Sequence, residues 1–417
     1  MGKRVDHVPQ ISNELAVCEA KGAETLHEVR CEDCAGCTFE SKVMRQDLEA
    51  FTADVLGRYG LSARDAETTA RVLVSADLRG IASHGVARLG RYVKGLKEGY
   101  IVPGVAFDIQ EPVPALAVID AKNGVGQVVS ELAMDLAIRK ARDNGLGLVT
   151  VRNSNHYGIA GYYAQKAIHA GMLGISLTNA APLVVPTFGA DAILGTNPIA
   201  LGAPGADGLD FLLDMATSVV PRGKLEVYDR NRKQMPLGWA VNANGYDTHD
   251  AGLVLHNLLQ RLGGGILPLG GRGEEFSGYK GYGLALMVDV LCGVLSGSAY
   301  GPDVDNLQRE AKPGEIVAPR VGHFFMAIDI ARFMPLDQFR RRLADLFSML
   351  KDSRKALDHD TVYVHGEKER IRERLHEQSG IPLAENVHAA LKKIGEECGA
   401  PPPVTVAERM RRAGRRA

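Results

Sequence analysis

The sequence has no long apolar run, and its first residues lack the apolar segment of a secretory signal. No stretch reaches the roughly 18 apolar residues that a membrane-spanning helix requires. Residues 1–17, MGKRVDHVPQISNELAV, carry positive charge but no apolar segment follows it. We therefore expect no membrane contact and a cytoplasmic location.

The sequence also lacks an excess of one charge and a large supply of aromatic side chains. Its 417 residues include 49 Lys and Arg against 50 Asp and Glu, and only 6% are aromatic, with Trp239 the single tryptophan. A basic surface is needed to bind nucleic acid or an anionic membrane, and aromatic side chains are needed to stack on bases. The composition therefore argues against such partners and is ordinary for a globular protein.

The six cysteines are too few over this length for a disulfide framework, yet four lie in the first 37 residues. The run CEDCAGC (31–37) has the spacing of an iron–sulfur or zinc ligand set, with Cys18 or His27 as a candidate fourth ligand. Three interpretations stay open for residues 1–43: a metal site, a disordered extension, or sequence upstream of a start at Met44. Because no ferredoxin-like fourth Cys and Pro follow, we assign no metal ligand.

From Met44 the pattern is helical up to about residue 114. DLEAFTADVLGRYG (47–60) has apolar residues at helical spacing and ends at a glycine. Ser62 is placed to cap a second helix, with Asp65 three residues later. Residues 44–114 are therefore expected to form a helical unit.

Strands and helices alternate from residue 115 to 333. ALAVID (115–120), LGLVTV (146–151) and MLGISLTN (172–179) are expected strands, and the amphipathic segment 128–145 between the first two is an expected helix. The chain from about Leu336 is charged and helical. This alternation predicts an α/β fold.

Two glycine-rich segments are candidate nucleotide sites. Gly124 and Gly126 lie between a strand and a helix, but Val129 stands where a dinucleotide fingerprint needs Gly or Ala, so we interpret this segment as a turn. In GYKGYG (278–283), Lys280 lies near a predicted helix N-terminus, which is a plausible phosphate cradle. The alternative for this second segment is a linker with an incidental lysine.

Residues 83–88, Ser-His-Gly-Val-Ala-Arg, carry the strongest chemical signal. As a helix capped by Ser83, this segment would place His84 and Arg88 one turn apart on one face, at the positive end of the helix dipole. A proton-transfer group and a carboxylate-binding cation would suit a small hydroxy or keto acid. The alternative is a solvated polar face with a capping serine.

Seven segments together resemble the malate/L-lactate dehydrogenases of the sulfolactate-dehydrogenase type. In chain order they are DLRGIASHGVARLGRY (77–92), KNGVGQVV (122–129), VRNSNHYGIAGYY (151–163), ISLTNAAPLVVPTFGA (175–190), LGTNPIALGAP (194–204), DMATSVVPRGK (214–224) and GYKGYGLALMVDVLCGVLSG (278–297). The resemblance extends from Met44 to about Ala400. Pro221 and the longer stretch 253–265 depart from the family pattern.

The resemblance implies a non-Rossmann mixed-sheet core at 115–333 that binds NAD(P), with a helical domain formed by 44–114 and 334–417. It also implies a homodimer that transfers hydride between NAD, or alternatively NADP, and a small 2-hydroxy or 2-keto acid. The cofactor-binding residues that it implies are Asn179, Ala180, Asp214, Met215, Ala216, Lys280, Gly281, Gly366 and Glu367. The family usually has Pro where His365 stands.

For the reaction itself, the resemblance makes His84 the acid/base, Arg88 the carboxylate clamp and His156 an alternative proton acceptor. We expect Ser83 or Asp214 to orient the site. An imidazole exchanges protons near neutral pH, and a guanidinium holds a carboxylate through two parallel bonds. Arg222 and Arg230 are candidates to meet the 2′-phosphate of NADP, but neither decides between NAD and NADP. Two other functions stay open: a reductase of a cyclic 2-imino acid or diketo sugar acid, and a Cys-rich metal-binding adaptor.

Overall fold

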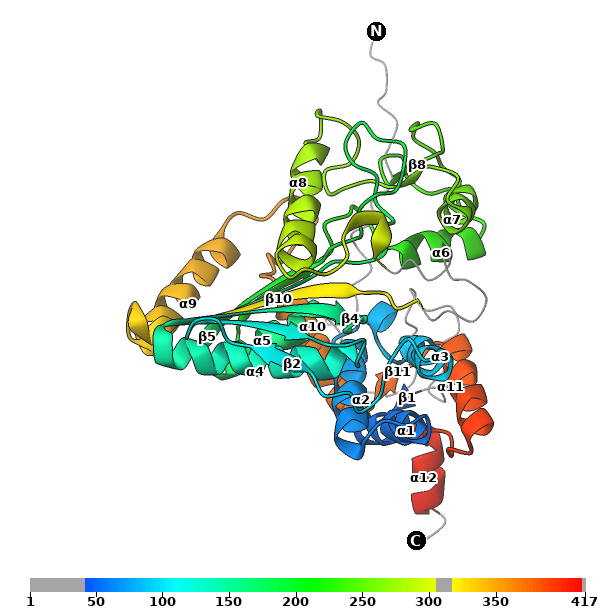
Figure 1. Ribbon diagram of the computed structural model, residues 1–417, viewed down its shortest axis with the longest axis horizontal. Helices are drawn as coiled ribbons and strands as arrows, with labels where there is room; N and C mark the ends of the chain where they lie inside the picture. Colours follow the sequence, from blue (N-terminus) through cyan, green and yellow to red (C-terminus); the bar gives the residue numbers. More distant parts are fainter. Residues whose placement is uncertain (1–41, 305–316, 415–417) are drawn as a thin grey trace.

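A computed structural model describes residues 42–304 and 317–414 of the chain (Figure 1). The cysteine run 31–37, Cys18 and His27 lie outside these ranges, so their predicted roles stay predictions. Among the described residues, no helix combines the length and the apolar character that crossing a bilayer requires. In the same ranges, no group of three or more His, Cys, Asp or Glu side chains is arranged to hold a metal ion.

A seven-stranded mixed sheet forms the centre of the molecule. Its strands, in spatial order, are β2 (Asp108–Gln110), β3 (Leu116–Asp120), β4 (Leu146–Ser154), β10 (Val321–Asp329), β5 (Met172–Thr178), β6 (Ile199–Ala203) and β7 (Phe211–Met215). Only β3 and β4 are parallel neighbours, and every other pair in this sheet is antiparallel. The predicted α/β class with a non-Rossmann mixed sheet is therefore confirmed, because a Rossmann sheet is mostly parallel.

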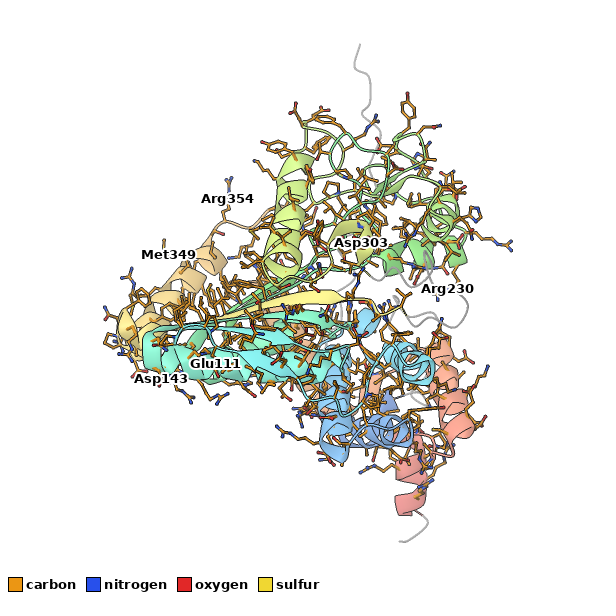
Figure 2. All side chains as sticks on the ribbon, in the orientation of Figure 1. Glu111, Asp143, Arg230, Asp303, Met349 and Arg354 are labelled. Carbon is orange, nitrogen blue, oxygen red and sulfur yellow. The ribbon has the colours of Figure 1, made fainter. Side chains whose placement is uncertain are left out.

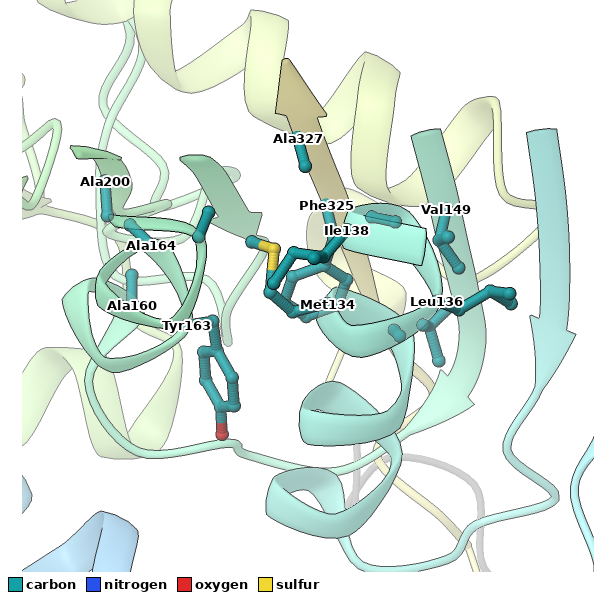
Figure 3. Packing of buried hydrophobic residues seen from close by; sticks show 14 of the residues in the cluster. Met134, Leu136, Ile138, Val149, Ala160, Tyr163, Ala164, Ala200, Phe325 and Ala327 are labelled. Atoms are coloured by element: carbon teal, nitrogen blue, oxygen red, sulfur yellow. The ribbon is translucent and has the colours of Figure 1, made fainter. Parts of the chain in front are cut away.

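Two helices, α4 (Gly126–Asn144) and α5 (Ala160–His169), cover one face of this sheet. Figure 3 shows the resulting core, in which Met134 from α4 and Tyr163 from α5 lie near Phe325 of β10. Alanine and glycine dominate the contact between helices and sheet; at Gly147, for example, a Cβ would lie 2.0 Å from a carbonyl oxygen of α4. The small side chains let these helices approach the strands closely.

The opposite face of the sheet packs against α8 (Gly278–Asp289) and the π-helical turn η4 (Val290–Val294), which follows it. Beyond α8, a third cluster of buried side chains joins α6 (Arg222–Arg230), α7 (Ala251–Gln260) and the two-stranded pair β8 (Ala240–Val241) and β9 (Gly265–Ile266). The stretch 253–265, longer than the family pattern, is therefore mainly the helix α7.

The two ends of the described chain share one core. Helices α1 (Arg45–Arg58), α2 (Ala63–Leu78) and α3 (Leu89–Glu98) pack with α11 (Glu385–Cys398), and β1 (Lys42–Val43) pairs with β11 (Ile381–Pro382). Val43 is fully buried. The fold thus includes the last two residues of the segment that the sequence pattern sets apart as 1–43.

Besides α11, the C-terminal segment forms the helices α9 (Leu336–Asp352), α10 (Glu367–Ser379) and α12 (Val406–Gly414). Figure 1 places α9 at the far end of the sheet, away from the helices α1–α3, and Figure 2 shows Met349 on its outer side. Only α10–α12 of the C-terminal segment therefore join the helices of the N-terminal part, and the domain limits predicted from the sequence stay a prediction.

Of two helix starts predicted from capping residues, the structure confirms one and contradicts the other. The Ser62 hydroxyl accepts the Asp65 N–H at 3.2 Å and caps α2, as predicted. The helix predicted to begin at Ser83 is wrong: the chain forms two 3₁₀ turns, η2 (Ala82–His84) and η3 (Val86–Arg88), and α3 begins only at Leu89. The Asp77 carboxylate accepts the Val86 N–H at 2.7 Å, which holds the chain in this broken form.

His323 is fully buried in β10, between the strands that lead to the candidate site. Its Nδ1 lies 2.7 Å from the Thr178 hydroxyl and its Nε2 lies 2.8 Å from the Ser154 hydroxyl, while its ring stacks on Tyr157 at 4.6 Å. Burial lowers the pKa of His323 to about 3. The imidazole is therefore neutral in the folded protein and charged in the unfolded chain below its ordinary pKa of 6.5.

We predict that His323→Gln makes folding stability less sensitive to acid. A lowered folded pKa contributes stability above pH 6.5, which is lost as the pH falls toward 3, by up to about 1.4 kcal/mol per pH unit for one group. The free energy of unfolding, measured with urea between pH 7 and 4.5, should depend less steeply on pH in the variant. The difference in slope should correspond to about one proton fewer taken up on unfolding. Exposed His359→Gln is the control and should follow the parent slope. An unchanged slope in His323→Gln would contradict the prediction.

Candidate active site

Two histidines from distant segments meet beside the central sheet. His84 lies in η2 and His156 lies in the loop between β4 and α5. Their rings are stacked with centroids 5.7 Å apart and an interplanar angle of 19°. The structure thus brings together the two imidazoles that the sequence pattern offers as alternative proton acceptors.

The turn around His84 also contains Ser83 and Arg88. The Ser83 hydroxyl lies 2.9 Å from Nδ1 of His84. Nε of Arg88 donates to the Ser83 carbonyl at 2.7 Å, which fixes the guanidinium through one of its five N–H groups. Ser83 therefore contacts His84 directly and does not cap a helix, contrary to the prediction.

His156 is held by Tyr92, which the sequence analysis did not single out. The Tyr92 hydroxyl lies 2.6 Å from Nδ1 of His156, and the Gly158 N–H donates to the same nitrogen at 3.3 Å. A backbone N–H only donates, so this nitrogen accepts and the proton of neutral His156 is on Nε2. The available signal for Tyr92 was its position four residues after Arg88, on the same face of a helix.

Both imidazoles are neutral in the free protein. Burial, followed by the charges of Arg88 and Arg91, lowers the pKa of His84 to about 4. Burial also lowers the pKa of His156 well below 6.5, and Arg91 is the next largest cause. A proton on either ring would add a third positive charge beside Arg88 and Arg91, which would repel it. Each imidazole therefore stays neutral and keeps a free electron pair at neutral pH.

A cleft of about 250 Å³ opens beside the segments that flank the two histidines, although neither His84 nor His156 lines it. It is lined by Ile81, three residues before His84, and by Ile159, three residues after His156. Asp214 and Gly366 also line it, so the structure brings together two separate segments predicted to bind the cofactor.

Asp214 is a half-buried carboxyl group in the wall of this cleft. It accepts the Gly161 N–H at 2.7 Å, in the first turn of α5. Burial raises its pKa to about 6 despite that bond and the charge of Arg79. Met215 and Ala216 follow Asp214 at the end of β7 and are half-buried.

The side chains of this cleft suit part of a nicotinamide dinucleotide. Lys368 is a cation that matches a phosphate, and Asp214 and Glu369 are carboxyl groups that match ribose hydroxyls. Gly366 has φ +91° at the start of α10, and a Cβ there would lie 3.0 Å from Leu212, so the backbone itself forms this wall. Its neighbour Glu367 accepts the Val364 N–H and pairs with Lys351.

The other predicted cofactor residues lie elsewhere. Lys280 is exposed at the start of α8, and Gly281 packs against the backbone of Leu269. The buried Asn179 side chain donates to Asp289 and accepts the Gly322 N–H, so its polar atoms are used within the protein. The Ala180 N–H donates to the Asn197 side chain. The cofactor role of these four residues stays a prediction.

Comparison with known proteins finds relatives that match most of the described chain. A family profile described as malate/L-lactate dehydrogenase matches residues 43–392. The malate dehydrogenase of Pyrococcus abyssi is 47% identical over 358 residues, covering 86% of this chain and 95% of that protein. The L-sulfolactate dehydrogenase of Methanocaldococcus jannaschii is 39% identical over 346 residues, covering 83% and 94%. The solved structure of malate dehydrogenase from Pyrococcus horikoshii OT3 has a TM-score of 0.78 at 44% identity, covering 87% and 96%.

We predict that the two histidines titrate far below ordinary histidines, which NMR of histidine-labelled protein will measure. His84 should titrate near pH 4, and Arg88→Gln should raise this value by roughly one unit because a repelling positive charge is removed. Arg139→Gln, an exposed arginine on α4, is the control and should leave the value unchanged. A wild-type titration of His84 near 6.5 would contradict the electrostatics described above.

Proposed function

Because the chain belongs to the malate/L-lactate dehydrogenase family and is a nicotinamide-dependent 2-hydroxyacid dehydrogenase, we propose that it interconverts malate and oxaloacetate with NAD. The observation that supports the choice of substrate is that two arginines, Arg88 and Arg91, follow His84 within seven residues and that, after burial, their charges are the next causes of its low pKa. Arg88 and Arg91 both lower the pKa of His84, so both charges act at the proton-transfer position. Malate has two carboxylates to match two cations, whereas lactate has one.

His84 is the proposed proton acceptor. The Ser83 hydroxyl lies 2.9 Å from Nδ1 of His84, and in this assignment it accepts an Nδ1–H, so that the electron pair on Nε2 takes the proton of the substrate hydroxyl. Arg88 holds the carboxylate next to that hydroxyl, which fixes the orientation of the C2 hydrogen. When bound, the nicotinamide ring accepts the hydride from C2.

His156 is proposed as a hydrogen-bond donor to the same substrate oxygen. Its Nδ1 already accepts from the Gly158 N–H and faces Tyr92, so its free side is the Nε2–H. A neutral N–H group stabilises negative charge that develops on the oxygen but takes up no proton there. The two stacked histidines thereby have different tasks at one oxygen.

NAD is proposed over NADP because of the charges in the cleft. Asp214 and Glu369 line it, and the charge of Arg79 is met by Glu373 at 3.1 Å. A 2′-phosphate would meet these carboxyl groups, whereas a 2′-hydroxyl can donate to them. Of the two arginines that the sequence offers for a 2′-phosphate, Arg222 is paired with Glu226 on α6 and Arg230 is exposed at the end of the same helix.

The homodimer expected from the resemblance is also proposed here. The outer side of α8 and η4 exposes a row of apolar side chains, among them Leu286, Val290 and Val294, the last 57% exposed. Such a row would be covered by a second copy of the chain. The cytoplasmic location stays a prediction from the sequence.

The first test of the proposed function is a substrate panel with malate, sulfolactate and lactate, each with NAD and NADP. Malate with NAD should have a kcat/KM above that of lactate, and Arg91→Gln should lower kcat/KM for malate by about 10- to 100-fold with a smaller effect on lactate. Arg139→Gln is the matched control for loss of a surface charge. Equal use of lactate and malate by the wild-type protein would contradict the choice of malate.

The second test separates the two histidines. His84→Gln should lower kcat for malate oxidation by roughly 10²- to 10⁴-fold, because an amide accepts no proton at this position. His156→Gln keeps an N–H donor near the position of Nε2 and should cost only about tenfold. Turnover and circular dichroism of both variants are compared with wild type. A larger loss in His156→Gln than in His84→Gln would make His156 the proton acceptor.

A further inference from the structure

The turn that carries His84 depends on a contact from outside it. The segments η2 and η3 are each a single 3₁₀ turn of three residues, joined at Gly85. Such short turns have few hydrogen bonds of their own and little intrinsic stability. Asp77, at the C-terminal end of α2, supplies one from outside, because its Oδ2 accepts the Val86 N–H at 2.7 Å.

The Asp77 carboxyl group lies directly against the backbone of this turn. A Cβ placed on Gly85 would lie 2.0 Å from Oδ1 and 2.2 Å from Oδ2 of Asp77. No side chain fits at residue 85 without moving the turn, the carboxyl group or both. The pair Asp77 and Gly85 therefore determines where the chain between His84 and Arg88 runs.

Asp77 itself is held firmly. It is 5% exposed, and its helix end is tied to α10 by two contacts. Nδ1 of His376 lies 2.8 Å from the Leu78 carbonyl, and Arg79 pairs with Glu373 at 3.1 Å. Because Asp77 has little freedom to move, its hydrogen bond fixes the position of the turn. A misplacement of about 1 Å at a reacting group lowers the rate by up to about 10²-fold.

We propose that Asp77 is a positioning residue for the dehydrogenase reaction, holding the His84 turn through the Val86 N–H so that the imidazole meets His156 and Arg88. This proposal rests on the proposed role of His84 as proton acceptor. Asp77 touches neither substrate nor cofactor in this assignment. The contact requires an acceptor oxygen at this place, which both the charged and the neutral carboxyl group provide.

The test compares Asp77→Ala with Asp77→Asn. Asp77→Ala removes the acceptor and should lower kcat for malate oxidation by about 10- to 100-fold, with the Kd for NADH, measured by fluorescence, within threefold of wild type. Asp77→Asn keeps an acceptor oxygen of the same reach and should restore kcat to within about fivefold. This rescue distinguishes an anchored turn from a general loss of packing.

Three further variants complete the design. Gly85→Ala forces the turn away from Asp77 and should reduce kcat in the same way, and it replaces Asp77→Ala if that variant does not fold. Asp329→Ala removes a carboxylate that accepts the Ala331 N–H at 3.0 Å at the far end of β10, and should keep wild-type kcat. His84→Gln is measured beside them to test the proton acceptor separately.

Two results would overturn the proposal. One is a folded Asp77→Ala or Gly85→Ala protein with wild-type kcat and KM while His84→Gln is inactive. The other is an Asp77→Asn protein as impaired as Asp77→Ala, which would make the charge, and not the anchored turn, the important property. An active His84→Gln protein would instead contradict the proposed function and leave the anchoring contact without a catalytic purpose.

Discussion

The contact between the two neutral imidazoles of His84 and His156 is the constraint on which the site depends. Their centroids lie 5.7 Å apart, and two guanidinium groups act on the same rings. Protonation of either ring would put a third positive charge among these groups in a partly buried place, which is costly. Burial and like charge therefore keep both rings unprotonated at neutral pH, as the proposed role of His84 as proton acceptor requires.

The two histidine segments are held by the same kind of hydrogen bond, although His84 and His156 lie 72 residues apart in the sequence. In each, a carboxyl group accepts a backbone N–H close to the histidine: buried Asp77 from Val86, and half-buried Asp214 from Gly161. Each carboxyl group also lies against a glycine that has no room for a Cβ, Gly85 or Gly161. Burial raises the pKa of both carboxyl groups, to about 7 and about 6. Removing these two carboxyl groups from water is costly. Each holds the backbone of a segment that carries one of the two histidines.

Much of the fold could be predicted from the sequence, because hydrophobic periodicity and caps act locally. The strands at 115–120, 146–151 and 172–179, the helix that ends at Gly145 and the Ser62 cap are all confirmed. The wrong prediction, a helix from Ser83, failed because Asp77 competes for the Val86 N–H from outside the segment. Tyr92 was missed for a similar reason, since its contact with His156 spans 64 residues. Local patterns carry no information about such partners.

A base with a pKa near 4 raises a difficulty for the reverse reaction, in which an imidazolium must return a proton to the keto oxygen. The causes of the low pKa resolve it. Part of the shift comes from Arg88 and Arg91, and on the proposed assignment the carboxylates of the bound acid face these two cations. A bound anion cancels their repulsion, so the proton affinity of His84 rises when substrate occupies the site. On this assignment, binding of the acid favours proton uptake by His84, while burial, the largest cause of the low pKa, still acts on the imidazole.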